Sequence, residues 1–145
     1  MSKINKVRFV NLNYNNNSMK IDDETFFLDC ENTMFNLRNG GGKSVLVQMM
    51  ISPFVHKRYR SFKDRPFESY FTKSTPTYIL VEWKLDNGGG YVLTGIMVRK
   101  RETVSDEDSK EKLDIISFVS EYTNSCECDI DNIKIVDKDG DRKSV

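Results

Sequence analysis

Three consecutive glycines, Gly40 to Gly42, stand directly before Lys43 and Ser44. Glycines let backbone N–H groups approach phosphate oxygens closely, and the N-terminus of a following helix adds partial positive charge. In such a loop the lysine reaches the β- and γ-phosphates and the serine hydroxyl holds Mg²⁺. These residue types predict a binding site for ATP and Mg²⁺, with Ser44 as the metal ligand. The predicted nucleotide-binding residues are Arg38, Asn39, Gly40, Gly41, Gly42, Lys43, Ser44 and Val45.

The loop departs from the formal pattern G-x-x-x-x-G-K-[ST] at one position, because Leu37 stands where the first glycine is expected. A glycine-rich turn followed by an exposed lysine at a helix start is the alternative interpretation. The flanking elements favour the phosphate loop: Thr33–Leu37 is expected to be a short strand. From Ser44 onward the chain is apolar nearly all round a helix, which predicts a buried helix that ends near Pro53.

A second candidate for chemistry is the segment His56–Phe67, in which basic side chains alternate with aromatic ones. Basic residues can follow a phosphate backbone while aromatic rings stack on bases. Alternatively, the aromatic rings dock on the core and the charges stay in water, and the sequence leaves both interpretations open. The residues predicted to bind DNA are Lys57, Arg58, Arg60, Lys63 and Arg65.

The three cysteines, Cys30, Cys126 and Cys128, show no disulfide-framework spacing. Together with the only histidine, His56, they form no recognisable zinc spacing, so we expect reduced thiols and no metal held by them. No residue in the chain is predicted to be catalytic.

The remaining elements are predicted from alternation of apolar and polar residues and from turn-forming residues. Thr77–Leu85 and Tyr91–Val98 are expected to form a β-hairpin through Asp86–Gly90. The other expected strands are Ile4–Leu12, a second strand that begins at Met19–Ile21, Thr25–Leu28, Ile115–Val119 and a weaker one at Ile130–Val136. Solvated turns or loops are expected at Asn15–Ser18, Asp22–Glu24, Arg99–Lys112 and Asp137–Asp141.

The composition fits one domain over residues 1–145, with a P-loop strand and helix within 1–60 and an antiparallel β region within 77–136. The 145 residues include 22 basic and 22 acidic ones, so a nucleic-acid partner must be met by a local patch. No apolar run is long enough to span a bilayer, and the first residues lack the apolar region of a signal peptide. We therefore expect no membrane partner and a cytoplasmic location.

Two stretches resemble the N-terminal end of the SMC-like group of ABC-type ATPases, which includes SMC proteins, SbcC, RecF and RecN. Val7–Tyr14 is similar to their opening strand and Asn-Phe/Tyr turn, and Asn39–Ser44 is similar to their Asn-Gly-Ser-Gly-Lys-Ser loop, with Gly41 in place of serine. The hairpin at Thr77–Val98 looks like the β-subdomain that follows their first helix.

This resemblance implies an α/β (α+β) fold, the N-lobe of a P-loop ABC-type ATPase, with a mixed, largely antiparallel sheet around one P-loop helix. It implies a second ATPase head as partner, either the protein's own C-terminal part or another subunit, in a homodimer of heads that sandwich ATP. It also implies action on DNA in chromosome maintenance, repair or antiviral defence.

The later motifs of that group are missing here, because no apolar strand ends in the paired acids of a Walker B motif. The only glutamine, Gln48, lies in the P-loop helix, not in a Q-loop. We therefore expect either an N-terminal fragment of a longer chain or a short chain that must pair with others, incomplete for ATP hydrolysis alone. The alternative is a DNA-binding or scaffolding module with a degenerate P-loop. A kinase or GTPase of another P-loop class is disfavoured by the antiparallel region after the helix.

Overall fold

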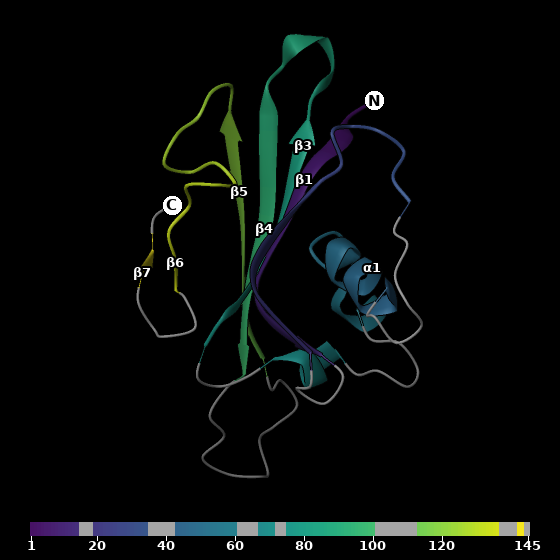
Figure 1. Cartoon of the computed structure of the whole chain (residues 1–145), viewed down its shortest axis with the longest axis vertical. Helices are drawn as coiled ribbons and strands as arrows, with labels where there is room; N and C mark the ends of the chain where they lie inside the picture. The colour runs from purple at the N-terminus through teal and green to yellow at the C-terminus, as the bar shows by residue number, and fades with distance from the viewer. Residues whose placement is uncertain are drawn as a thin grey trace.

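The computed structural model describes residues 1–14, 19–34, 43–60, 67–71, 75–100, 113–136 and 142–143. Its centre is a five-stranded sheet with the strand order β2-β1-β3-β4-β5, and all four pairings are antiparallel (Figure 1). The strands are β1 (Lys3–Tyr14), β2 (Met19–Phe27), β3 (Thr77–Lys84), β4 (Tyr91–Lys100) and β5 (Leu113–Tyr122), and a small second sheet pairs β6 (Ile135–Val136) with β7 (Arg142–Lys143).

The helix α1 (Lys43–Ile51) covers one side of the sheet, which we call the helix face, and the segment that leads to β6 covers the opposite side, the rear face (Figure 1). The described residues also form three short 3-10 helices: η1 (Lys57–Tyr59), η2 (Phe67–Tyr70) and η3 (Asp86–Gly88). In its described residues the protein is therefore a mixed α and β fold with one α-helix. The sequence predicted a mixed, largely antiparallel sheet; the antiparallel part is confirmed, and no parallel pair occurs among the described strands.

The strand predictions for β1, β3, β4 and β5 are confirmed, and each of β1, β4 and β5 is longer than expected. The hairpin between β3 and β4 is also confirmed: its ends are joined by a hydrogen bond from Leu85 N to Gly90 O of 2.9 Å. Gly90 has a φ of +83°, and a Cβ there would lie 2.8 Å from the backbone oxygen of Tyr122. This turn therefore needs glycine for two reasons, the backbone conformation and the close approach of β5.

The predicted turn at Asp22–Glu24 is wrong, because these acids lie in the middle of the single strand β2. Asp23 pairs in register with Val10 of β1, and its carboxylate faces the buried guanidinium of Arg8. Three successive acids disfavour a strand by composition, but pairing with β1 and an ionic partner outweigh that preference. Asn15–Ser18, the predicted loop between the two strands, lies outside the described residues.

The prediction of a strand over Ile130–Val136 is correct only for its last two residues. Ile130 lies in a turn and is fully buried against Leu80 and Leu93 on the rear face. The apolar residues of this stretch therefore fill the rear core from an irregular segment. Of the predicted loop 99–112, Arg99 and Lys100 end β4 and the rest lies outside the described residues, as does the turn 137–141.

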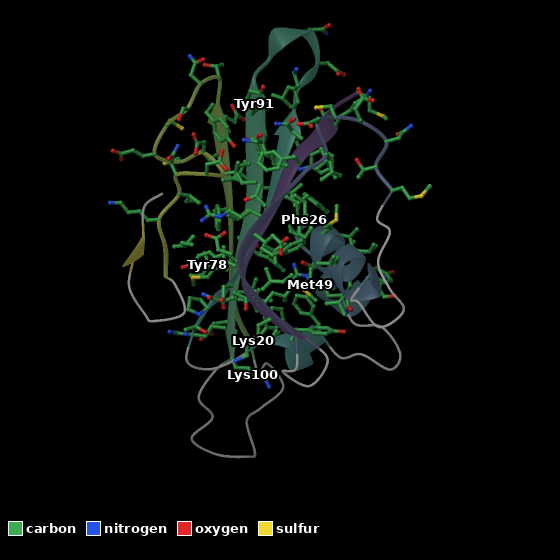
Figure 2. The ribbon with its side chains drawn as sticks, in the orientation of Figure 1. Lys20, Phe26, Met49, Tyr78, Tyr91 and Lys100 are labelled. Atoms are coloured by element: carbon green, nitrogen blue, oxygen red, sulfur yellow. The ribbon has the colours of Figure 1, made fainter. Side chains whose placement is uncertain are left out.

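Two apolar clusters hold the layers together. On the helix face, Met49 of α1 is fully buried with Phe9 and Ile79, and Figure 2 shows Met49 and Phe26 on this side of the sheet. Tyr78 lies on the other side and packs with the rear cluster. Both faces of β3 are therefore buried, which fixes the central strands and gives α1 a rigid base.

Candidate functional site

The helix predicted to follow the glycine-rich loop is present. Within the described residues α1 runs from Lys43 to Ile51, and Ser44 is exposed in its first turn. Val45 and Leu46 are buried against the sheet, which fixes the direction of the helix axis. The first N–H groups of any α-helix have no partner within the helix, so the start of α1 is suited to an anion.

Most of the predicted nucleotide-binding residues cannot be compared with the structure. Arg38, Asn39, Gly40, Gly41 and Gly42 lie outside the described residues, and Lys43 is described by its backbone only. What the structure brings together is therefore the first turn of α1: the backbone of Lys43, the exposed Ser44 and the buried Val45.

The helix is buried on one side only, so the prediction of burial all round is wrong. Gln48 and Met49 are buried, whereas Val47 is 50% exposed and Ile51 is 39% exposed. Among the described residues, one face of α1 packs on the sheet and the other face is exposed to solvent. The predicted stop is confirmed: the helix ends at Ile51, and Pro53 follows in a turn.

The strand predicted before the glycine-rich loop is absent from its described part. Thr33 and Met34 have no regular secondary structure and are exposed, while residues 35–37 lie outside the described residues. The chain leaves the sheet after β2 through Asp29 and Cys30, which both have positive φ, and the N–H of Cys30 bonds to Ile4 O at 3.2 Å. β1 already has β2 and β3 as neighbours, so no further strand can pair with it.

The basic and aromatic segment begins immediately after α1. Arg58 is exposed, and its guanidinium carbon lies 4.6 Å from the ring centre of Tyr59. Arg60 is half-buried: its Nε donates to Ser52 O at 3.0 Å, and its own carbonyl accepts a hydrogen bond from Gln48 Nε2 at 2.6 Å. Burial lowers the pKa of the Arg60 guanidinium from its ordinary value.

The predicted DNA-binding residues therefore differ in their surroundings. Arg58 faces solvent, whereas Arg60 also ties its segment to the end of α1. Within the described residues neither arginine forms an ion pair. The side chain of Lys57 is not described, and Lys63 and Arg65 lie in the part of the chain for which no structure is described.

Of the aromatic residues in this segment, Phe67 is buried and packs on the core, as the alternative interpretation expects, while Tyr59 is 57% exposed. The phenylalanine ring also lies 5.9 Å from the guanidinium carbon of Arg60. The expected docking of aromatic rings on the core is therefore confirmed for Phe67, whereas DNA binding by this segment stays a prediction.

Gln48 joins the helix to this segment but is incompletely bonded. It is 1% exposed, and within the described part of the chain no hydrogen-bond donor reaches its Oε1. A buried carbonyl without a donor costs free energy, about 1–3 kcal/mol. Gln48 is thus a buried link between α1 and Arg60, and its amide is not placed at the start of the helix.

A polar network that the sequence did not reveal lies on the rear face. Arg8 donates to both carboxylate oxygens of Asp23, at 2.8 and 2.6 Å, and to the carbonyl of Ile130 at 2.8 Å. Lys6 Nζ lies 2.9 Å from Asp131 Oδ2. These contacts attach the segment before β6 to β1. The detectable signal in the sequence was a lone arginine inside the apolar strand β1.

A second part of the same network is centred on the buried carboxylate of Glu82. Its oxygens accept hydrogen bonds from Asn5 Nδ2, at 2.7 Å, and from the hydroxyl of Tyr122. Burial and the neighbouring Glu82 raise the pKa of that hydroxyl well above its ordinary value. Because each oxygen of the Glu82 carboxylate accepts a hydrogen bond, the arrangement compensates for burial of this carboxylate and stabilises the fold.

The cysteines are free thiols, with Cys126 and Cys128 exposed and Cys30 half-buried. In the ranges that the structure describes, no group of three His, Cys, Asp or Glu side chains could hold a metal ion. None of the described helices is long and apolar enough to cross a membrane.

In comparisons with known proteins, no family profile matches the chain, and no curated protein or solved structure is significantly similar to it.

Proposed function

We propose that this chain binds Mg-ATP at the start of α1, through Asn39 to Ser44, as the N-terminal lobe of an SMC-like ATPase head. The observation that carries the proposal is the coincidence of two features. The Gly-Gly-Gly-Lys-Ser sequence ends in the first turn of a nine-residue helix, and that helix is anchored on a rigid antiparallel sheet.

The residues of the first turn have the chemistry that this ligand requires. Lys43 would offset negative charge on the β- and γ-phosphates, and the exposed Ser44 hydroxyl would hold Mg²⁺. Val45 contributes its backbone N–H, while its buried side chain keeps the helix in place. In this class of site catalysis relies on positioning and electrostatic stabilisation, so a fixed helix is a functional requirement.

Hydrolysis would need groups from elsewhere. Gln48 is buried and bonded to Arg60, so its amide cannot serve at the phosphates. In the proposed complex a second ATPase head supplies the signature motif and the acidic residues, and head engagement couples ATP to work on DNA. The isolated chain would then bind nucleotide without turning it over.

The test is equilibrium binding of Mg-ATP to the chain and to Lys43→Ala, measured by titration calorimetry. We expect saturable binding that Lys43→Ala reduces at least tenfold, and binding that is unchanged in Lys84→Ala, a control at an exposed lysine on β3. Wild-type affinity in Lys43→Ala, or no binding by the unmodified chain, contradicts the proposal.

The alternative is a DNA-binding module, and one observation favours it. Arg58 and Arg60 stand in a stretch, residues 52–63, that contains no acid, and within the described residues neither has a carboxylate partner. Arg60 is partly desolvated and has no counter-ion among the described residues, and a bound phosphate would supply one. Both arginines could contact the backbone of a nucleic acid, with Tyr59 available for stacking.

This second candidate predicts DNA binding that needs no nucleotide and weakens steeply with salt. Charge reversal by Arg58→Glu should weaken binding to a duplex in fluorescence anisotropy and lower the slope of log K against log [salt] by about 1–2. Arg58 is preferred to Arg60 because its side chain is exposed, and Lys3→Glu, an exposed lysine on β1, is the matched control. Equal affinity in Arg58→Glu and the unmodified chain would exclude this use of the segment.

A further inference from the structure

β5 is the last strand of the sheet, and within the described residues no strand pairs with its outer edge. It runs for ten residues, and its pairing with β4 continues without a bulge from Leu113 to Tyr122. Every second residue of an edge strand turns its N–H and C=O groups away from the sheet. The edge of β5 is therefore a long, regular template for another strand.

The two edge strands of the sheet differ in charge, and charged residues are one means by which proteins prevent an edge strand from pairing with another chain. β2, the opposite edge, carries three consecutive acids, Asp22–Glu24, and charged residues on an edge oppose pairing with a second chain. Residues 115–120 of β5 carry no charge. Instead, Ile116 is 56% exposed on the rear face and Val119 is 67% exposed on the helix face.

We propose that β5 pairs antiparallel with β5 of a second copy of this chain, joining the two five-stranded sheets into one. The two-fold axis of such a pair is perpendicular to the sheet, and side chains directly opposite each other lie on the same face. The axis must therefore relate one residue of β5 to the same residue of the second copy. If it related two successive residues, side chains from opposite faces of the sheet would have to pair.

The sequence of β5 selects the position of the axis at Ser117. Ile115 then lies opposite Val119 of the second copy on the helix face, and Ile116 lies opposite Phe118 on the rear face. Apolar side chains thus meet on both faces, as cross-strand pairing favours.

The charges support the same position. With the axis at Ser117, Asp114 lies opposite Ser120 of the second copy and Glu121 lies opposite Leu113 at the end of the strand. An axis at Phe118 instead places Glu121 opposite Ile115, and an axis at Ile116 places Asp114 opposite Phe118. Both alternatives set a carboxylate against a central apolar side chain, which carries a desolvation cost.

This interface uses neither α1 nor the glycine-rich loop, so it can be tested without nucleotide. Sedimentation equilibrium of the unmodified chain should show a concentration-dependent monomer–dimer equilibrium. Val119→Lys places a charge in the centre of the edge and should give a monomer with an unchanged circular dichroism spectrum, since this side chain is exposed.

The matched control is Phe27→Lys, a change at a similarly exposed apolar residue (62% against 67% for Val119) on the opposite edge of the sheet, and this variant should dimerise like the unmodified chain. A chain that stays monomeric at every soluble concentration overturns the proposal, and so does a Val119→Lys variant that dimerises normally. Dimerisation lost in Phe27→Lys but kept in Val119→Lys would assign the interface to β2.

Cross-linking tests the register. After replacement of Cys30, Cys126 and Cys128 by serine, Ser117→Cys puts two thiols opposite each other, with Cβ atoms about 4.5–5.5 Å apart. Copper-catalysed oxidation by dissolved oxygen, which accepts the two electrons and two protons, should join them as a disulfide. Glu121→Cys is the control: eight residues of offset separate its thiols by about 27 Å. Cross-linking of Glu121→Cys but not of Ser117→Cys overturns the register.

Discussion

The ion pair between Arg8 and Asp23 offers a sharp test of the corrected β2 strand. The Arg8 side chain is 3% exposed, and two of its hydrogen bonds go to the Asp23 carboxylate, at 2.8 and 2.6 Å. Asp23→Ala removes that partner and leaves a buried guanidinium bonded mainly to the carbonyl of Ile130. If the Asp22–Glu24 stretch were a solvated turn, the same change would have almost no effect.

The expected loss of unfolding free energy is about 2 kcal/mol. Removing one partner of a fully buried ion pair costs about 3–5 kcal/mol, because the other charge is left uncompensated. Asp23 is 39% exposed, so water can replace part of its interaction with Arg8, and the bond to Ile130 remains. These two features place the cost below that range.

Urea denaturation followed by circular dichroism measures this loss, with Glu24→Gln as control. Glu24 is exposed on the other face of the same strand, so its change should stay within about 0.5 kcal/mol. A double-mutant cycle with Arg8→Met should give a coupling energy of about 1–2 kcal/mol. An Asp23→Ala cost no larger than that of Glu24→Gln, or a coupling near zero, would refute the reasoning.

Two further predictions concern buried polar groups. The raised pKa of the Tyr122 hydroxyl means that the unfolded chain loses this proton first, so unfolding free energy should fall as pH rises above 10.0. In urea denaturation, the Tyr122→Phe variant should lose less unfolding free energy above pH 10.0 than the unmodified chain. Identical pH profiles for the two proteins would contradict this prediction. Gln48→Met loses a hydrogen bond to Arg60 but also removes the unpaired Oε1, so its unfolding free energy should be unchanged or higher. A loss of unfolding free energy above about 1.5 kcal/mol in thermal denaturation would contradict this expectation.

The sequence predicts those elements whose signals are local. The alternation in Thr77–Leu85 gives β3, and the glycines before Tyr91 give the hairpin to β4. The start of α1 follows from the change from glycine to Lys-Ser, and its end from Pro53. In each case a pattern within about ten residues determines the type of the element and at least one of its limits.

The wrong predictions concern segments whose structure depends on residues far away in the sequence. Asp23 lies in a strand because Arg8 lies beside it, a pairing that the local composition of β2 opposes. Thr33 and Met34 lie outside the described sheet, in which β2 and β3 already occupy both sides of β1, and no local pattern reveals this arrangement. Ile130 is buried without being in a strand, and an apolar run alone does not distinguish these cases.

In the candidate site, too, features with a local sequence signal could be predicted, and features that depend on distant residues could not. The start of α1 could be predicted, since Lys43 and Ser44 come directly after the glycines. The half-buried setting of Arg60 could not, because it depends on the Ser52 carbonyl and the Gln48 amide at the end of the helix. Only the folded chain brings these groups together.

The most direct test of the proposed function is a ¹H–¹⁵N NMR titration of the chain with Mg-ATP. Nucleotide binding at the start of α1 predicts saturable shifts of the amide signals of Gly40 to Val45, and their loss in Lys43→Ala. Shifts confined to Arg58 and Arg60 would instead indicate an anion site in the basic segment. Unchanged signals from Gly40 to Val45 at saturating Mg-ATP would contradict the account.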